Sequence, residues 1–148
     1  KVYKVGCLGK INDHQKSESG KILINLTGLV RFEIIEEVKS SKLYREFKVN
    51  YKKFNLDLEP SLDDIDLEKL MGVVKIFFKK NGILLNWNEF EKLDKIQKIN
   101  TLAMIAPITN EEKQKLLESI SLQEKVKNLQ DIMSFYLYDT DFNNQTVQ

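Results

Sequence analysis

The chain has 148 residues, of which 23 are Lys or Arg and 22 are Asp or Glu, with one cysteine, one histidine and no apolar run near the roughly 20 residues of a membrane span. The balanced charge argues against a global field that attracts nucleic acid or anionic membrane, and a single cysteine excludes an internal disulfide. We therefore expect a cytoplasmic protein with no membrane partner. Only Arg31 and Arg45 are arginines, which further disfavours specific nucleic-acid recognition.

The first third of the chain has the composition of strands. Residues 4–11 lead to a polar turn at 15–20, and residues 22–28 run back in β-branched alternation. Residues 29–35 continue in the same style, so two strands and the start of a third are predicted. After a polar connection, residues 43–51 resume strand character.

Pro60 lies in a loop-like stretch and favours an extended residue before it. The sheet half is therefore predicted to end here, which gives a β-rich subdomain over residues 1–60.

The next helix is predicted to start at Ser61 or Asp63, either of which can cap it, and to end at Asn81-Gly82. One face is apolar and carries Leu67, Leu70, Val74, Phe77 and Phe78. The acidic side chains in its first turn are explained by the helix dipole and indicate no metal site. A zinc site of the usual Cys/His kind is likewise not expected, because the chain has one cysteine and one histidine. Cys7 and His14 are seven apart and would point to opposite faces of a strand, so they form no nucleophilic pair, and we expect Cys7 to be a small buried side chain.

Three further helices follow. Trp87 and Phe90 lie in a short helical or turn segment, and residues 95–106 form a helix that Pro107 ends. Two capping boxes mark the next two helix starts, Thr109 with Glu112 and Ser121 with Glu124.

The helices are predicted to form a helical subdomain over residues 61–138, followed by a disordered tail over 139–148. Strands first and helices after define the α+β class. Because each helix carries one apolar stripe, we expect the following side chains to meet in one core: Leu102, Leu117, Leu129 and Met133.

These segments resemble a known family. The motifs are Val5-Gly6, the turn that ends in Gly20, the run 28–32 (GLVRF), and the segments 102–108 and 112–118. Over roughly residues 3–137 the chain is similar to the substrate-binding N-terminal domain of Lon proteases and to the stand-alone LON-domain proteins. The resemblance implies a PUA-like antiparallel β-rich subdomain followed by a small helical bundle.

LON domains usually begin with a Pro-containing apolar strand and a helix ahead of the Val-Gly strand, whereas this sequence begins at Lys1, just before that strand. The β-rich subdomain is therefore expected to be incomplete at its N-terminus. The first strand, around residues 3–11, should either pair with a separate segment or another copy of the protein, or lie at an edge of the sheet.

No catalytic motif is found. Neither Gly9-Lys10 nor Gly20-Lys21 has the glycine and hydroxyl spacing of a phosphate-binding loop, and the serine motif of the Lon peptidase does not occur. The resemblance therefore implies the recognition part of an ATP-dependent protease, with no enzymatic activity and no cofactor. We interpret the chain as a module that binds unfolded or partly folded polypeptide, or as an adaptor that works with a protease.

Aromatic side chains on or near the last predicted strand and its exit loop are the candidate peptide-binding residues: Tyr44, Phe47, Tyr51 and Phe54. The alternative is that Phe47 and Tyr51 form the core face of the sheet. Two other functions stay open, a small hydrolase and an RNA-binding PUA-like module. The RNA alternative would use a rim of lysines, namely Lys10, Lys16, Lys21, Lys39 and Lys42.

Overall fold

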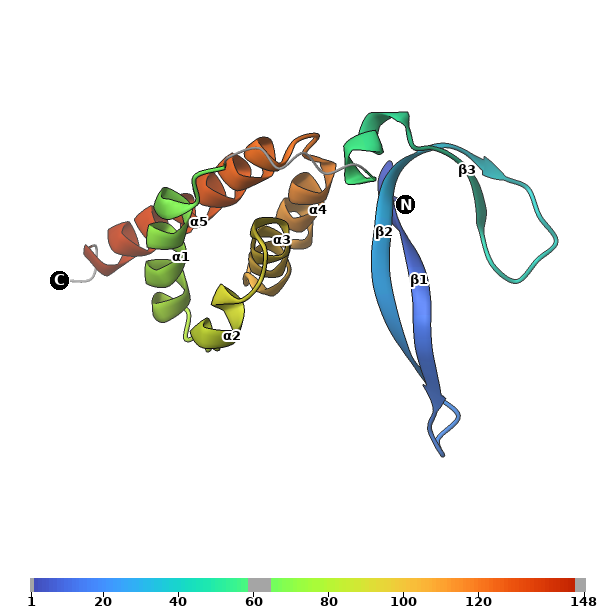
Figure 1. Cartoon of the computed structure of the whole chain (residues 1–148), viewed down its shortest axis with the longest axis horizontal. Helices are drawn as coiled ribbons and strands as arrows, with labels where there is room; N and C mark the ends of the chain where they lie inside the picture. The colour runs from blue at the N-terminus through green and yellow to red at the C-terminus, as the bar shows by residue number, and fades with distance from the viewer. Residues whose placement is uncertain (1, 59–64, 146–148) are drawn as a thin grey trace. The chain divides into compact units, whose positions relative to one another are not determined.

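The computed structural model describes residues 2–58 and 65–145, with strands first and helices after (Figure 1). This order confirms the α+β class. The chain divides into two compact units, Lys1–Leu62 and Asp63–Gln148, here called the sheet unit and the helical unit.

The sheet unit is an antiparallel meander. Its strands are β1 (Val5–Lys16), β2 (Ile22–Val38) and β3 (Glu46–Asn50), in the order β1-β2-β3. The sequence predicted a new strand at Leu29, and this is wrong because no turn residue interrupts the run. β2 continues through Leu29, pairing first with β1 and then, from Glu33 onward, with β3.

Two irregularities bend the β1–β2 ribbon. Leu8 pairs with Val30 and Gly9 with Gly28, so Leu29 is an extra residue, and Asn12 is extra in β1 between Ile11 and Asp13. Such bulges increase the local twist. Within the described residues β2 is the only strand paired with β1, so β1 lies at an edge of the sheet, as one of the two expected arrangements requires.

The buried part of the sheet unit is small. Val5, Val30 and Phe54 are its buried apolar residues, and Phe54 comes from the 3-10 helix η1 (Lys52–Asp57). The ring of Phe32 lies directly over Gly6, since a Cβ built at Gly6 would be 2.7 Å from Cζ of Phe32. The Val-Gly motif therefore has a packing reason, because glycine leaves room for this ring.

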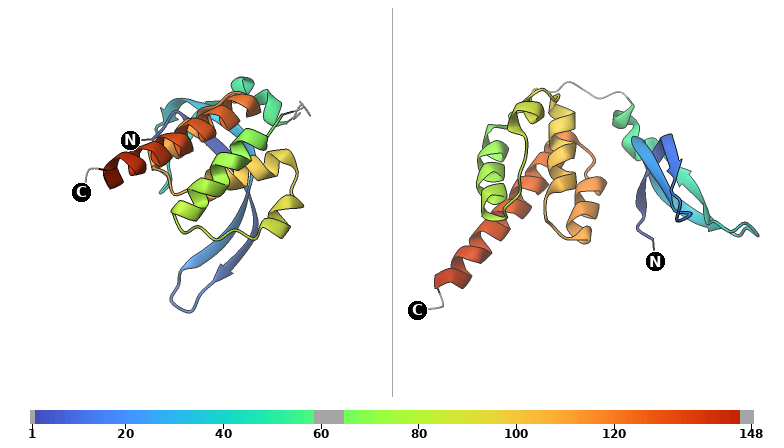
Figure 2. Two further views of the ribbon diagram at one scale, coloured as in Figure 1. Left: turned by 90° about the vertical axis from the view of Figure 1, so that its left-hand side faces the viewer. Right: turned by 90° about the horizontal axis from the view of Figure 1, so that it is seen from below.

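The helical unit contains five helices (Figure 2). Its elements are α1 (Glu68–Lys80), α2 (Trp87–Glu91), α3 (Lys95–Ile105), α4 (Asn110–Glu118) and α5 (Leu122–Gln145). α1 packs beside α5, while α3 and α4 contact each other and α5. The helix α1 ends at Asn81-Gly82 as predicted, with Gly82 at a φ of 66°. It begins at Glu68, whose amide donates to Asp66, so the start lies later than predicted; Ser61 and Asp63 fall outside the described residues.

Side-chain caps fix three of the helix starts. The box between Thr109 and Glu112 is present as predicted, and a further box joins Asp94 to Gln97 at the start of α3. Ser121 accepts from the amide of Glu124, but the carboxylate of Glu124 accepts from the amide of Ile120 and not from that of Ser121. The prediction that Glu124 accepts from the Ser121 amide is therefore wrong, because the carboxylate binds the amide one position before the capping serine.

The core of the helical unit contains Leu102, Leu129 and Met133 with no exposed surface, as predicted. Leu117 is half-buried, and Leu116 takes the core position instead. The reason is the helical phase of α4, because Leu116 lies one turn after Glu112 and one turn before the buried Ser119, on the inner face.

The backbone of α5 remains helical past Asp139 to Gln145, where the sequence predicted a disordered tail. Adding residues to an existing helix is easy, since each new residue gains one hydrogen bond.

Glu112 also joins α4 to α5. Its Oε2 atom accepts from the Thr109 amide at 2.8 Å and from the hydroxyl of Tyr136 at 2.9 Å. This hydrogen bond raises the pKa of the Tyr136 hydroxyl above its ordinary value, and partial burial and the negative charge of Glu112 act in the same direction.

Candidate functional site

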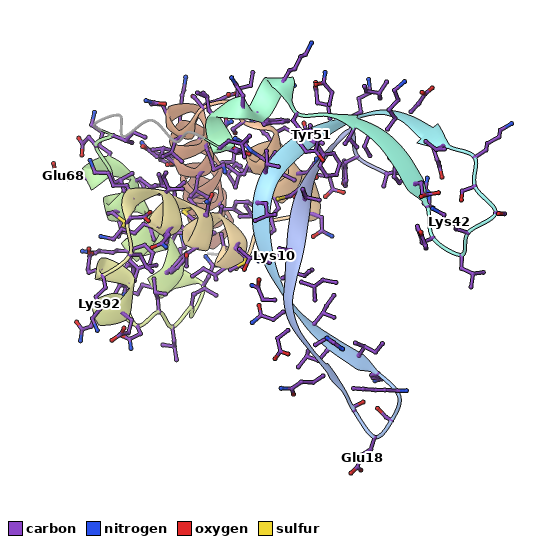
Figure 3. All side chains as sticks on the ribbon, turned by 45° about the vertical axis from the view of Figure 1, so that its right-hand side comes forward. Lys10, Glu18, Lys42, Tyr51, Glu68 and Lys92 are labelled. Atoms are coloured by element: carbon purple, nitrogen blue, oxygen red, sulfur yellow. The ribbon has the colours of Figure 1, made fainter. Side chains whose placement is uncertain are left out.

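The four predicted aromatic residues occupy different environments. Phe54 is fully buried, and Tyr44 is exposed in the loop between β2 and β3. Tyr51 packs edge-on against Phe32, with ring centroids 6.2 Å apart. All four lie in the described part of the chain, and no ring contact there joins any two of them. Figure 3 shows Tyr51 at one end of β3 and Lys42 in the loop beyond the other end.

Phe47 is half-buried and has a cation over its ring. The guanidinium of Arg45 lies 5.0 Å from the ring centroid of Phe47 and forms two hydrogen bonds of 2.7 Å with the carboxylate of Glu37. The bonds from Arg45 hold the pKa of Glu37 below its ordinary value, with a smaller opposing effect of desolvation. Arg45 is thus engaged with Glu37 of the neighbouring strand β2, and the set Tyr44, Phe47, Tyr51 and Phe54 stays a prediction.

No pattern in the sequence predicts the main polar contact of the sheet unit. Arg31 is buried on β2, and its Nε and Nη2 donate to Asp57 in η1, with Nη2 2.7 Å from Oδ1. The backbone amide of Arg31 donates to the same carboxylate at 2.9 Å. The guanidinium lies 4.5 Å from the centre of the Phe54 ring, so one arginine fixes η1 on the sheet. The Phe54 ring is thus part of this contact, and its role in peptide binding stays a prediction.

The largest exposed feature of the sheet unit is the β1–β2 ribbon between Gly9 and Gly28, which we call the arm (Figure 3, where Lys10 and Glu18 are labelled). The side chains of this ribbon are exposed throughout. Its turn is closed by Gly20, which has a φ of 79°. An exposed arm offers its whole surface for contact.

One face of the arm is aliphatic. Alternate residues of a strand share a face, and residues paired across strands share it too. Ile22, Ile24 and Leu26 alternate along β2, and Ile11 pairs with Leu26. The four side chains are between 46% and 62% exposed. We call this set the aliphatic face.

A lysine and a histidine, and no carboxylate, accompany the aliphatic face along the two strands of the arm. Lys16 pairs with Ile22, and His14 pairs with Ile24, whereas Asp13 pairs with Asn25 on the opposite face. A shallow hollow of about 390 Å³ is lined by residues of both faces, at positions 13–15 and 23–26. The arm therefore presents an open surface, unlike the enclosed pockets that bind small molecules.

The sequence identified residues 22–28 as a strand but could not show that its aliphatic side chains are exposed. Alternation reports which residues share a face, and it does not report whether another layer covers that face. For the same reason the expectation for Cys7 is wrong. Its side chain is exposed on β1, the edge strand.

Within the part of the chain that the structure describes, no three His, Cys, Asp or Glu side chains come close enough to hold a metal ion. None of the described helices is both long and apolar enough to cross a membrane.

An α+β architecture with an open aliphatic ribbon is compatible with a binding module. The model of one protein family, the substrate-binding domain of ATP-dependent protease La (LON), matches residues 1–134. The chain therefore belongs to the LON substrate-binding domain family, a non-catalytic domain that binds polypeptide substrates. A search of curated proteins finds no match.

Proposed function

We propose that this domain binds unfolded or partly folded polypeptide through the aliphatic face of the arm. The observation that carries the proposal is the exposure of Ile11, Ile22, Ile24 and Leu26 on a single face. Soluble proteins seldom leave contiguous aliphatic surface exposed without a binding role. Unfolded chains expose the apolar side chains that such a surface recognises.

The edge of β1 supplies a second kind of contact. In the described residues β1 pairs with β2 alone, so its outer edge from Gly9 to Lys16 has backbone groups open to an added strand. An extended segment bound there would gain main-chain hydrogen bonds, which do not depend on its sequence, while its alternate side chains reach the aliphatic face. This combination suits a module that accepts many different unfolded segments.

We further propose that the domain works as an adaptor that delivers bound polypeptide to a protease in the cytoplasm, since this domain is itself non-catalytic. Tyr44, Phe47 and Tyr51 are proposed as additional contacts of the bound chain.

An RNA-binding role has less support. Several cations of the sheet unit are held by carboxylates, in the pairs Arg31–Asp57, Lys42–Glu46, Arg45–Glu37, Lys48–Glu36 and Lys53–Glu33. Both arginines, the residues best suited to phosphate and base contacts, are thus engaged within the unit, although Lys42 is the only lysine of the predicted rim in an ion pair among the described residues.

A pair of matched variants tests the aliphatic face. Leu26 and Leu23 are both exposed on β2 but lie on opposite faces of the arm. Leu26→Ser should weaken the binding of a fluorescently labelled, reduced and carboxymethylated protein by about tenfold, because a leucine contributes up to roughly 1.5–3 kcal/mol on full burial. Leu23→Ser should leave the affinity unchanged.

Fluorescence anisotropy with the full chain gives the affinities, and thermal melts show that both variants fold. Equal effects of the two substitutions would contradict the proposal, as would unchanged binding by Leu26→Ser.

A further inference from the structure

A groove on the helical unit lies between α1 and α2. It has a volume of about 580 Å³ and is lined by Lys75, Lys79, Ile83 and Trp87, among others. The buried ring of Phe78 lies at its apolar side, with its centroid 6.4 Å from that of Trp87. Trp87 also packs edge-on against Phe90 at 5.7 Å, so the indole is held in place from two sides.

The groove is cationic. Lys75 and Lys79 are exposed and lie four residues apart on α1, on the same side of the helix. The ammonium of Lys75 is 5.9 Å from the centre of the Trp87 ring. Glu91 also lines the groove, but its carboxylate accepts from Lys98 at 2.7 Å, and this bond keeps the pKa of Glu91 below its ordinary value. Lys98, which does not line the groove, thus balances the charge of Glu91.

An exposed aliphatic side chain follows one of the groove residues in the chain. Leu84, which follows the lining residue Ile83, is 98% exposed, although leucine is normally a core residue. The described packing of the unit gives this side chain no cover. The site therefore combines two ammonium groups with an indole ring and aliphatic carbon.

We propose that this groove binds acidic, apolar polypeptide segments, with a carboxylate between Lys75 and Lys79 and an apolar side chain against Trp87. The inference goes beyond the proposed function, because it assigns a second contact surface and a charge preference to the helical unit. It is carried by charge complementarity and does not depend on the arm.

A polypeptide fits better than an oligonucleotide. Acidic residues outnumber basic ones in residues 63–148, so the unit as a whole repels a long polyanion. The groove contributes two lysines and no arginine, so it can make few contacts with a phosphate backbone. A short peptide with one or two carboxylates between apolar side chains matches both the charge and the aromatic surface.

The indole gives a direct assay, because Trp87 is the only tryptophan of the chain. The full protein is titrated with a short peptide that carries two Asp residues between leucines and contains no tryptophan. We expect a saturable change in Trp87 fluorescence, and a dissociation constant that rises with salt because the contacts are exposed ion pairs. The same peptide with Asn in place of Asp should bind at least about tenfold more weakly.

Charge reversal locates the site. The double variant Lys75→Glu and Lys79→Glu should raise the dissociation constant by at least about tenfold. Lys127→Glu, an exposed lysine on α5 outside the groove, serves as the matched control and should leave it unchanged. Single Lys79→Gln provides a milder variant should the double variant fail to fold, and it should weaken binding in the same direction.

The proposal is overturned if the acidic peptide gives neither a fluorescence change nor binding heat, or if the Asn peptide binds equally well. It is likewise overturned if both groove variants bind as the parent does, or if a single-stranded oligonucleotide binds more tightly than the peptide. The arm variant Leu26→Ser should keep full peptide binding, so failure of the groove and failure of the arm are separate results.

Discussion

At the scale of single residues, the sheet unit depends on Arg31. Its guanidinium is almost fully buried, hydrogen-bonded to Asp57 and placed over Phe54. A buried ion pair adds little when compared with apolar packing, but removal of one partner leaves the other charge without compensation. Arg31 and Asp57 should therefore tolerate substitution poorly.

Asp57→Asn should lower the free energy of unfolding of the sheet unit by about 1.5–3 kcal/mol, because it removes the negative charge that accepts the hydrogen bonds of Arg31. Hydrogen exchange of the β2 amides measures this change. Glu36→Gln breaks an exposed pair with Lys48, whose atoms are 3.4 Å apart, and should cost no more than about 1 kcal/mol. Similar costs for both variants would show that the Arg31–Asp57 pair is not buried in solution.

The hydroxyl of Tyr136 predicts a dependence of stability on alkaline pH. Its pKa is raised in the folded protein, so the folded state keeps a proton that the unfolded state loses. The stabilisation is complete below the ordinary tyrosine pKa of about 10 and is lost as pH rises through the raised value.

The melting temperature of Tyr136→Phe should therefore lie below that of the parent at neutral pH, and the gap should narrow above about pH 10. Thermal melts between pH 7 and 11 test this. Tyr138→Phe, which changes an exposed tyrosine on the same helix, is the control. A gap that stays constant with pH would show that the hydrogen bond to Glu112 does not form.

At the scale of elements, the inner stripe of α5 holds the helical unit together. Leu129 has no exposed surface, and Leu129→Ala should cost about 2–5 kcal/mol. Leu117→Ala removes the same atoms from a half-buried position on α4 and should cost clearly less. Urea unfolding followed by Trp87 fluorescence reports on this core, because Trp87 packs against it. Equal costs would mean that Leu117 is as central as Leu129.

Helices were easier to predict than strands because their ends carry local chemistry. The box between Thr109 and Glu112 and the glycine at 82 depend on residues a few positions apart. The continuation of β2 through Leu29 depends on pairing with β1 and β3, which the local pattern of β2 does not contain.

The candidate site was harder to predict for a similar reason. Phe54 and Tyr44 are both aromatic residues near β3, yet one is fully buried and the other exposed. The difference depends on Arg31 and Asp57, which lie 26 positions apart. The local pattern also placed groove residues such as Lys75 and Trp87 only within their own segments. Their proximity depends on the turn between α1 and α2, which that pattern does not describe.

At the scale of the whole molecule, the two units differ in charge. Basic residues outnumber acidic ones in residues 1–62, and the reverse holds in residues 63–148, so the near-neutral total hides two opposite contributions. The proposed cationic groove is thus a local exception within an acidic unit. Charge of this kind influences which ligands approach each unit.

The meander of the sheet unit also has a consequence for biosynthesis. Each of these strands pairs with the next one in the chain, so none depends on a partner that is distant in the sequence. Contacts between neighbours in sequence favour rapid folding, and N-terminal regions emerge first from the ribosome. The three strands are therefore able to pair while residues 63–148 are still being translated, and a nascent chain would expose its aliphatic ribbon to the ribosome surface and to chaperones before any helix of the second unit exists.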